Sequence, residues 1–185
     1  MPKYIVLLRG VNVGGNNKLK MADLRSALEA HNFTNVQTYI QSGNIVADFK
    51  SSSATTVARE VESVISNEFN LQVPAISVTR SQLLKVAQSN PYPGEQDMRR
   101  LHAIFLPKPH DKETLIRIEE TVQSVRAKGS NDSLTVIGTI MYLHTPDGFG
   151  TSDLAKALTT KSSKLTQGGT ARNWATVTTL IDLSA

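Results

Sequence analysis

The order of apolar patterns along the chain constrains its fold most. The first pattern, residues 3–9, contains the continuous apolar run Ile5 to Leu8 and is typical of a central strand buried on both faces. It is followed by a helical stripe (Met21, Leu24, Leu28), a hairpin pattern (residues 36–49), a second helical stripe (57–69) and a short strand (74–78). With right-handed crossovers, this βαββαβ order predicts a four-stranded antiparallel sheet with helices on one face.

Most of this order occurs again after Asn90-Pro91-Tyr92-Pro93-Gly94, a cluster that breaks regular structure. The second set comprises a strand (101–106), a helical stripe (115–125), a hairpin (133–144) and a helix from about Ser152 to Leu158. We therefore predict an α+β protein of two ferredoxin-like halves, residues 1–90 and 98–185, with antiparallel sheets and helices packed on one face. We interpret Thr170 as the N-cap of a final helix that contains Trp174. Extra C-terminal helices, and no closing strand, are therefore expected in the second half.

Two local signals refine the first half. Asn32 stands just past the first helical stripe, where a residue in the left-handed conformation commonly ends a helix. Thr79 and Gln82 have the spacing of a capping box, which predicts that a third helix starts at Thr79.

Composition and charge exclude several classes of protein. The chain of 185 residues contains no cysteine, which excludes disulfides, thiol catalysis and zinc-thiolate sites. Its four histidines are scattered without metal-ligand spacing, so we expect no metal and no cofactor. No apolar run is long enough to cross a membrane and no secretory signal is recognisable, so we expect a cytoplasmic protein without a membrane partner. The net charge of +4 mildly favours anionic partners.

The first candidate ligand site is the loop of residues 9–20, which we name the basic loop. Its glycines free backbone N–H groups to face a ligand, and the following helix N-terminus favours an anion. The candidate residues are Arg9, Asn12, Gly14, Gly15, Lys18 and Lys20. The loop is neither a Walker A motif nor a dinucleotide-binding GxGxxG motif. The alternative is a glycine-rich turn that lets strand and helix pack closely, with Asn12 as a local cap.

The second candidate is Gln41-Ser42-Gly43-Asn44, between the two strands of the first hairpin, with Gln41, Ser42 and Asn44 as ligand-binding candidates. Residues of these types are first of all turn formers, which is the alternative interpretation. Ser42 has no evident histidine partner, so it is not expected to be a nucleophile.

The third candidate is Arg172 with Asn173, in the first turn of the helix expected after Thr170. A positive charge at that place opposes the helix dipole, which suggests a guanidinium aimed at an anion. The alternative is a structural salt bridge to a carboxylate, with Trp174 in the core.

Several of these segments together resemble the bacterial domain-of-unknown-function family 1697. The resemblance rests on Leu7 to Gly15, Met21 to Leu24, Thr38 to Asn44, Asn90-Pro91-Tyr92 and Thr170 to Val177, and so spans nearly the whole chain. It implies the duplicated α+β fold and a bacterial protein. It implies no activity, because the family has none that can be carried over.

Three functional hypotheses follow. In the leading one, the basic loop and the pair Arg172 and Asn173 converge on a phosphate-bearing ligand, a nucleotide or nucleic acid, in a basic cleft between the halves. The second is an enzyme acting on a phosphorylated small molecule, with Arg9 and Arg172 as electrostatic stabilisers. The third is a structural module that binds protein. RNA binding through the sheet is weakly supported, because few aromatic residues are available and the RNP1 pattern is missing. The identity of the ligand and the oligomeric state are not specified by the sequence.

Overall fold

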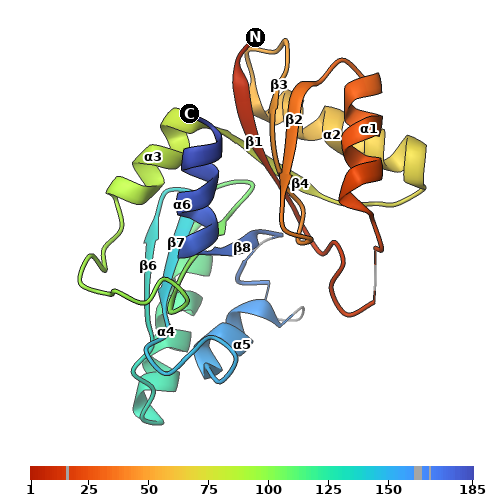
Figure 1. Ribbon diagram of the computed structural model, residues 1–185. Helices are drawn as coiled ribbons and strands as arrows, with labels where there is room; N and C mark the ends of the chain where they lie inside the picture. Colours follow the sequence, from red (N-terminus) through yellow and green to blue (C-terminus); the bar gives the residue numbers. More distant parts are fainter. Residues whose placement is uncertain (16, 161–163, 167) are drawn as a thin grey trace. The chain divides into compact units, whose positions relative to one another are not determined.

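The computed structural model describes residues 1–15, 17–160, 164–166 and 168–185. The chain divides into two compact units (Figure 1). Unit 1 comprises Met1–Lys85 and Thr179–Ala185, and unit 2 comprises Val86–Thr178.

Unit 1 is a four-stranded antiparallel sheet with strand order β2-β3-β1-β4. Its elements are β1 (Lys3–Leu8), α1 (Met21–Ala30), β2 (Thr34–Tyr39), β3 (Asn44–Asp48), α2 (Ala54–Phe69), β4 (Ala75–Thr79) and the first part of α3 (Arg80–Gln88). The central position of β1, between β3 and β4, agrees with the apolar run that predicted it.

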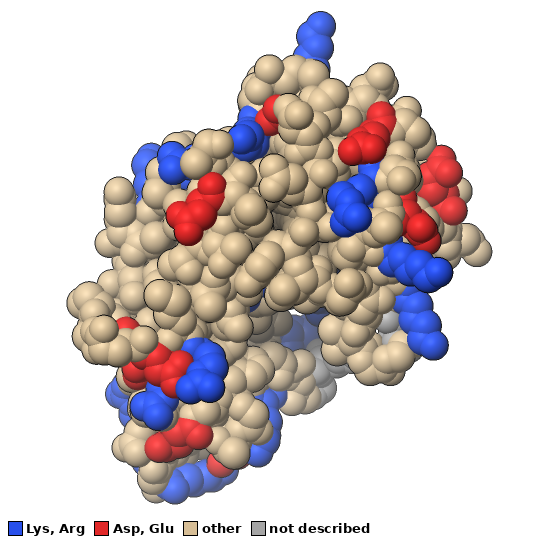
Figure 2. Space-filling model, in the orientation of Figure 1, with Lys and Arg blue, Asp and Glu red and all other residues tan. Residues whose placement is uncertain are grey.

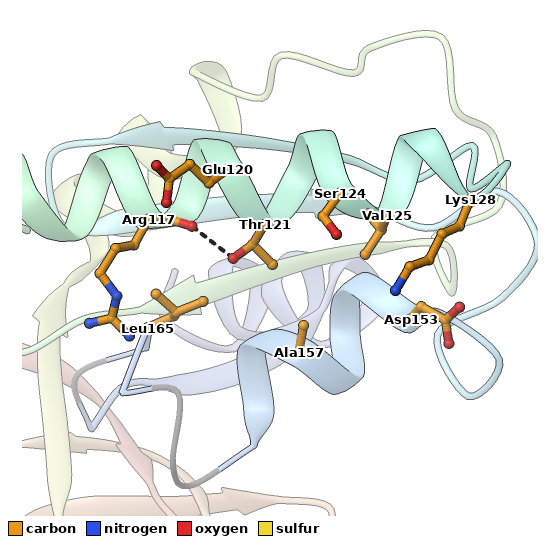
Figure 3. A pocket seen from close by; sticks show the side chains of 9 residues that line it. All are labelled: Arg117, Glu120, Thr121, Ser124, Val125, Lys128, Asp153, Ala157 and Leu165. Carbon is orange, nitrogen blue, oxygen red and sulfur yellow. Dashed lines mark hydrogen bonds between the residues drawn. The ribbon is translucent and has the colours of Figure 1, made fainter.

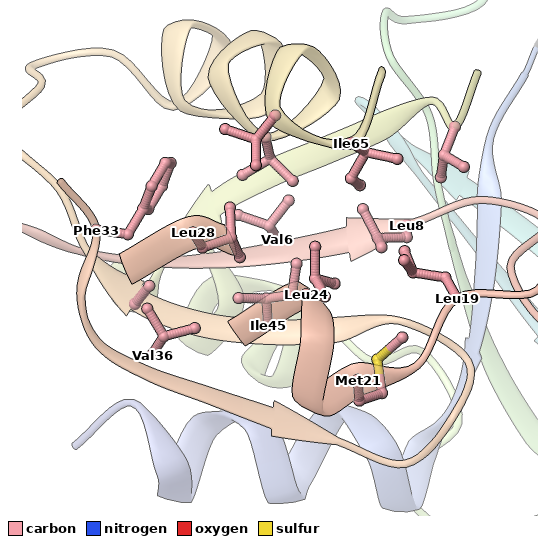
Figure 4. Packing of buried hydrophobic residues seen from close by; sticks show 14 of the residues in the cluster. Val6, Leu8, Leu19, Met21, Leu24, Leu28, Phe33, Val36, Ile45 and Ile65 are labelled. Atoms are coloured by element: carbon pink, nitrogen blue, oxygen red, sulfur yellow. The ribbon is translucent and has the colours of Figure 1, made fainter. Parts of the chain in front are cut away.

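The hydrophobic core of unit 1 lies between the sheet and helices α1 and α2. Val6 and Leu8 of β1 pack in this core with Leu24 and Leu28 of α1 and Ile65 of α2 (Figure 4). The alternate residues of β1, Ile5 and Leu7, point to the opposite face of the sheet and are also fully buried. Burial on both faces of this strand is confirmed.

Both local signals of unit 1 are confirmed. Asn32 adopts a φ of 66°, and the amides of Asn32 and Phe33 donate to the carbonyl oxygens of Glu29 and Leu28 in the Schellman pattern that ends α1. At the start of α3, the amide of Thr79 donates to the side chain of Gln82 at 2.8 Å, and the amide of Gln82 donates to the hydroxyl of Thr79 at 3.3 Å. This reciprocal pair is a capping box.

Unit 2 repeats the topology of unit 1, with strand order β6-β7-β5-β8. Its elements are β5 (Leu101–Phe105), α4 (Lys112–Ala127), β6 (Ser133–Ile137), β7 (Ile140–His144), α5 (Asp153–Thr159), β8 (Thr170–Asn173) and the first part of α6 (Trp174–Leu183). Its core contains Ile104 of β5, Met141 of β7, Ile118 of α4 and Leu154 of α5. The fold is therefore α+β with two ferredoxin-like halves, as predicted.

The expectation about the end of the chain was wrong in one respect. Residues Thr170–Asn173 form strand β8, which pairs with β5 and closes the second sheet, so Thr170 is not a helix cap. Helix α6 begins at Trp174, and Asn173 caps it by accepting the amide of Thr176 at 2.9 Å. The strand lacks an apolar pattern because its buried positions hold Thr170 and Arg172, whose polar groups form a mutual hydrogen bond of 2.7 Å.

No helix among the described residues is long and apolar enough to span a lipid bilayer.

Candidate functional site

The basic loop connects β1 to α1 and is held in shape by the side chain of Asn12. Its Oδ1 accepts the amide of Leu19 at 2.9 Å, and its Nδ2 donates to the carbonyl of Leu19 at 2.8 Å. The same Nδ2 donates to the carbonyl of Gln41 at 2.9 Å. One amide side chain thus closes the loop on itself and joins it to the turn between β2 and β3. The role of Asn12 as a local cap, considered from the sequence, is present and extends to a second loop.

The glycines of the basic loop are required by backbone conformation. Gly10, Gly14 and Gly15 have φ values of 69°, 59° and 80°, in the region that favours glycine. A Cβ atom built on any of them would meet no heavy atom of a described residue within 4 Å. Close packing of strand against helix is therefore not the reason for these glycines, and their open surroundings leave this part of the backbone accessible.

The charged side chains of the basic loop are exposed and cationic. Arg9, Lys18 and Lys20 are all exposed, and none forms an ion pair with a residue in the described part of the chain. Lys20 is the N-cap residue of α1 but makes no capping hydrogen bond through its side chain. The loop therefore presents three positive charges, of which those of Lys18 and Lys20 lie next to the N-terminus of α1 in sequence. Asp23 in the first turn of α1 is the nearest carboxylate in sequence.

The turn after β2 has a mainly structural role. Asn44 is fully buried and donates to the carbonyl of Tyr39 at 3.0 Å and to the hydroxyl of Ser42 at 3.1 Å. Gly43 is needed here, because a Cβ at this position would lie 2.7 Å from the Cβ of Leu8. The side chain of Gln41 is exposed. Of the three candidates in this turn, Ser42 and Asn44 bond to each other, and Gln41 alone is both exposed and joined to Asn12.

The remaining candidates, Arg172 and Asn173, belong to unit 2, whereas the other nine belong to unit 1. Arg172 is buried on β8, and its guanidinium donates to the hydroxyl of Thr170 at 2.7 Å and to the carbonyl of Ala171 at 2.8 Å. Burial lowers the pKa of Arg172 to about 10, which still leaves it charged at neutral pH. The side-chain oxygen of Asn173 accepts the hydrogen bond that caps α6.

A groove that we did not anticipate lies between α4 and α5, with a volume of about 630 Å³. Figure 3 shows Arg117 and Lys128 at its two ends on α4, Thr121 and Ser124 between them, and Asp153 on α5. The four residues of α4 are spaced at i, i+4, i+7 and i+11, so the sequence could have placed them on one helix face. Carboxylates of Glu120 and Asp153 also line the groove, which makes it less suited to an anion than the basic loop.

Unit 2 also contains two histidines in defined surroundings. The Nε2 of His144 lies 2.9 Å from Glu95, and its ring contacts that of Tyr92. His102 stacks on Phe149 with ring centroids 4.2 Å apart, and burial lowers its pKa to about 4. Within the described ranges, no three side chains of His, Asp or Glu gather as metal ligands would. A neutral, stacked His102 is best explained by packing.

The distribution of charge on the face seen in Figure 2 bears on the size of the anion that this face could bind. On the face seen in Figure 2, basic and acidic side chains are interspersed. A compact phosphate group needs only a few local positive charges, such as the basic loop carries, whereas a long duplex would need a continuous basic track.

Comparison with known proteins agrees with the fold and supplies no activity. A conserved bacterial protein from Streptococcus pneumoniae has a similar structure, with a TM-score of 0.73 and 23% sequence identity over 99% of this chain and 98% of that chain. At that identity the likeness concerns the fold alone. No curated protein matches the sequence. The model of a family described as protein of unknown function, DUF1697, matches residues 1–142. Because that match covers most of the chain, the protein belongs to the DUF1697 family.

Proposed function

We propose that unit 1 binds a phosphate-bearing ligand, a nucleotide or the phosphates of a nucleic acid, through the basic loop. The observation that carries this proposal is the combination of a loop held by the hydrogen bonds of Asn12 with three exposed cations, Arg9, Lys18 and Lys20, that form no ion pair with another described residue. Exposed cations of this kind attract an anion without first having to break an ion pair with another described residue.

Preorganisation is the physical advantage of this loop. The hydrogen bonds of Asn12 join the two ends of the loop, Asn12 and Leu19, before a ligand arrives, so less conformational entropy is lost on binding. Arg9 can contact a phosphate through two parallel hydrogen bonds, whereas Lys18 and Lys20 act as point charges. The open space around Gly14 and Gly15 leaves room for phosphate oxygens near the backbone.

The proposal is limited to residues of unit 1. Arg172 and Asn173 already use side-chain atoms in β8 and in the cap of α6, which supports a structural role for both. Their direct participation in ligand binding is not needed for the basic loop to bind an anion.

The test is a thermal-shift screen at low ionic strength, followed by calorimetric titration of any compound that stabilises the protein. The probes are inorganic phosphate, sugar phosphates, nucleoside mono- and triphosphates, and short oligonucleotides. A ligand present at 100 times its Kd stabilises a protein by about 2.7 kcal/mol. Stabilisation by nucleotides alone, or by oligonucleotides alone, would identify which source of phosphate is recognised.

Matched charge variants locate the site. The triple variant Arg9→Gln, Lys18→Gln and Lys20→Gln should lose at least about tenfold in affinity, since each lost contact to a charged group is worth about 1.5 kcal/mol or more. The control carries Lys50→Gln, Arg59→Gln and Lys85→Gln, which remove the same charge from exposed positions of unit 1 outside the loop. Equal loss in both triple variants, or no binding by the native chain, would refute the proposal.

A further inference from the structure

The edges of the two sheets differ in how well they are protected. Strand order places β2 and β4 at the edges of the first sheet, and β6 and β8 at the edges of the second. An edge strand exposes unpaired amide and carbonyl groups, and natural proteins block such edges with bulges, short strands, charges or covering groups.

Strand β2 is blocked by an irregular backbone. Its pairing with β3 shifts register between Thr34 and Gln37, and Asn35 within this interval has a φ of 53°. A bulge of this kind twists the strand and prevents a flat, continuous pairing surface.

Strand β4 is blocked by side chains that occupy its outward amides. The amide of Arg9 donates to Pro74, so alternation along the ladder turns the amides of Ala75 and Thr79 away from β1. The amide of Ala75 donates to Glu62 at 2.7 Å, and that of Thr79 donates to Gln82 at 2.8 Å. The outward amides at both ends of this edge are therefore already satisfied.

Strand β8 is short, and one of its carbonyl groups accepts a hydrogen bond from a charged side chain of the same strand. It has four residues, and the guanidinium of Arg172 donates to the carbonyl of Ala171 at 2.8 Å. Shortness and an added charge are both known ways to protect an edge.

Strand β6 has none of these protections. Its sequence, Ser-Leu-Thr-Val-Ile, contains no charge and no proline, and its five residues pair with β7 in unbroken register. The two residues Gly138 and Thr139 form the turn to β7, so the flanking pair Ile137 and Ile140 is hydrogen-bonded. Hydrogen-bonded pairs alternate, which points the amide and carbonyl groups of Leu134 and Val136 away from β7. No hydrogen bond within the described part of the chain occupies these outward groups.

We propose that β6 pairs with β6 of a second copy of this chain, antiparallel and about a two-fold axis at Thr135. In that register Leu134 lies opposite Val136 of the second copy, and Val136 opposite Leu134. Both residues of each pair have outward amides and carbonyls, so four hydrogen bonds form and the two four-stranded sheets become one of eight strands. The register is self-complementary, which a two-fold contact requires.

The side chains of β6 favour a second copy. Because the strand has no charged residue, two copies meet without like charges facing each other. Leu134 and Val136 pack on the core of unit 2, so the pairing would extend that core across the axis, and Ile137, 44% exposed, would gain a neighbour. A contact of two five-residue strands is small, so we expect a weak, concentration-dependent dimer.

The oligomeric state is measured by sedimentation equilibrium from about 1 μM to about 1 mM protein. The native chain should shift from monomer to dimer within this range. Hydrogen exchange gives a residue-specific readout, because the amides of Leu134 and Val136 should exchange about tenfold more slowly in the dimer than in dilute solution. A native chain that stays monomeric throughout, or a dimer in which these two amides exchange at the same rate as in dilute solution, would overturn the proposal.

Variants separate the strand contact from general effects on folding. Val136→Pro removes an outward N–H that β7 does not use and should raise the dimer Kd at least about tenfold. Val136→Ala loses similar packing but keeps the amide, so it should still dimerise. Thr135→Lys should also abolish the dimer by placing two lysines opposite each other across the axis, with Tyr92→Phe as the control for the lost hydrogen bond between Tyr92 and Thr135. Circular dichroism confirms that each variant is folded. Dimerisation of folded Val136→Pro and Thr135→Lys at the native Kd would refute this contact and assign the dimer to another surface.

Discussion

The contribution of the Asn12 hydrogen bonds to the stability of the protein can be tested by substitution. Asn12→Gly removes all three side-chain hydrogen bonds but accepts the native φ of 54° without strain. A typical intramolecular hydrogen bond contributes about 1 kcal/mol, and one of these three is exposed, so we expect the free energy of unfolding to fall by about 2 to 3 kcal/mol. Urea denaturation measures this change as a lower midpoint with an unchanged m value.

Asn12→Asp distinguishes hydrogen bonding from shape. The carboxylate keeps the acceptor for the amide of Leu19 but places an oxygen against the carbonyls of Leu19 and Gln41, where the native side chain donates at 2.8 and 2.9 Å. The loss at pH 7 should therefore be at least as large as for Asn12→Gly. In both variants, the amide of Leu19 should exchange faster with solvent. A change below about 0.5 kcal/mol in both variants would refute a stabilising role for the hydrogen bonds of Asn12, because that is the range of ordinary surface substitutions.

Two further predictions concern the core and pH. Gly43→Ala should lower the free energy of unfolding by about 2 to 5 kcal/mol, because the new Cβ would lie 2.7 Å from that of Leu8 and the residue has a φ of 79°. A thermal or urea midpoint within error of the native value would contradict the predicted clash. The pKa of His102 is about 4 in the folded protein against 6.5 for the free side chain, so the unfolded chain takes up this proton first as the pH falls. Stability should therefore decrease as the pH is lowered from 6.5 to 4, by up to about 3 kcal/mol from this residue. His102→Leu should reduce the slope of the free energy of unfolding against pH in this window, and an unchanged slope would exclude His102 as its source.

The fold could be predicted from the sequence where local chemistry and tertiary structure agree. The apolar run of β1 is buried on both faces of the sheet. Thr79 and Gln82 form the capping box that their spacing predicts. Asn32 took the left-handed conformation because a carboxamide side chain tolerates it at a helix end. These features depend on interactions within a few residues or on hydrophobicity alone.

The features that escaped prediction depend on contacts between distant residues. The start of a helix was predicted at β8 because Thr170 is a typical N-cap residue, whereas Thr170 and Arg172 lie buried on the strand and are joined by a hydrogen bond. The bond from Asn12 to Gln41 crosses 29 positions of sequence. To predict the groove between α4 and α5, one must know that α5 lies against one particular face of α4. In each case the sequence contained the residues but did not indicate which of them are in contact.

The central functional claim is that the basic loop receives a phosphate group, and residue-resolved NMR titration tests it most directly. On addition of a nucleoside triphosphate at low ionic strength, the amide signals of Gly10, Gly14 and Gly15 should shift in a saturable way, with the same Kd as the signals of Lys18 and Lys20. The shifts should vanish in the variant with Arg9, Lys18 and Lys20 changed to glutamine. Saturable shifts confined to residues outside positions 9–20, or none with any phosphate-bearing probe, would contradict the claim.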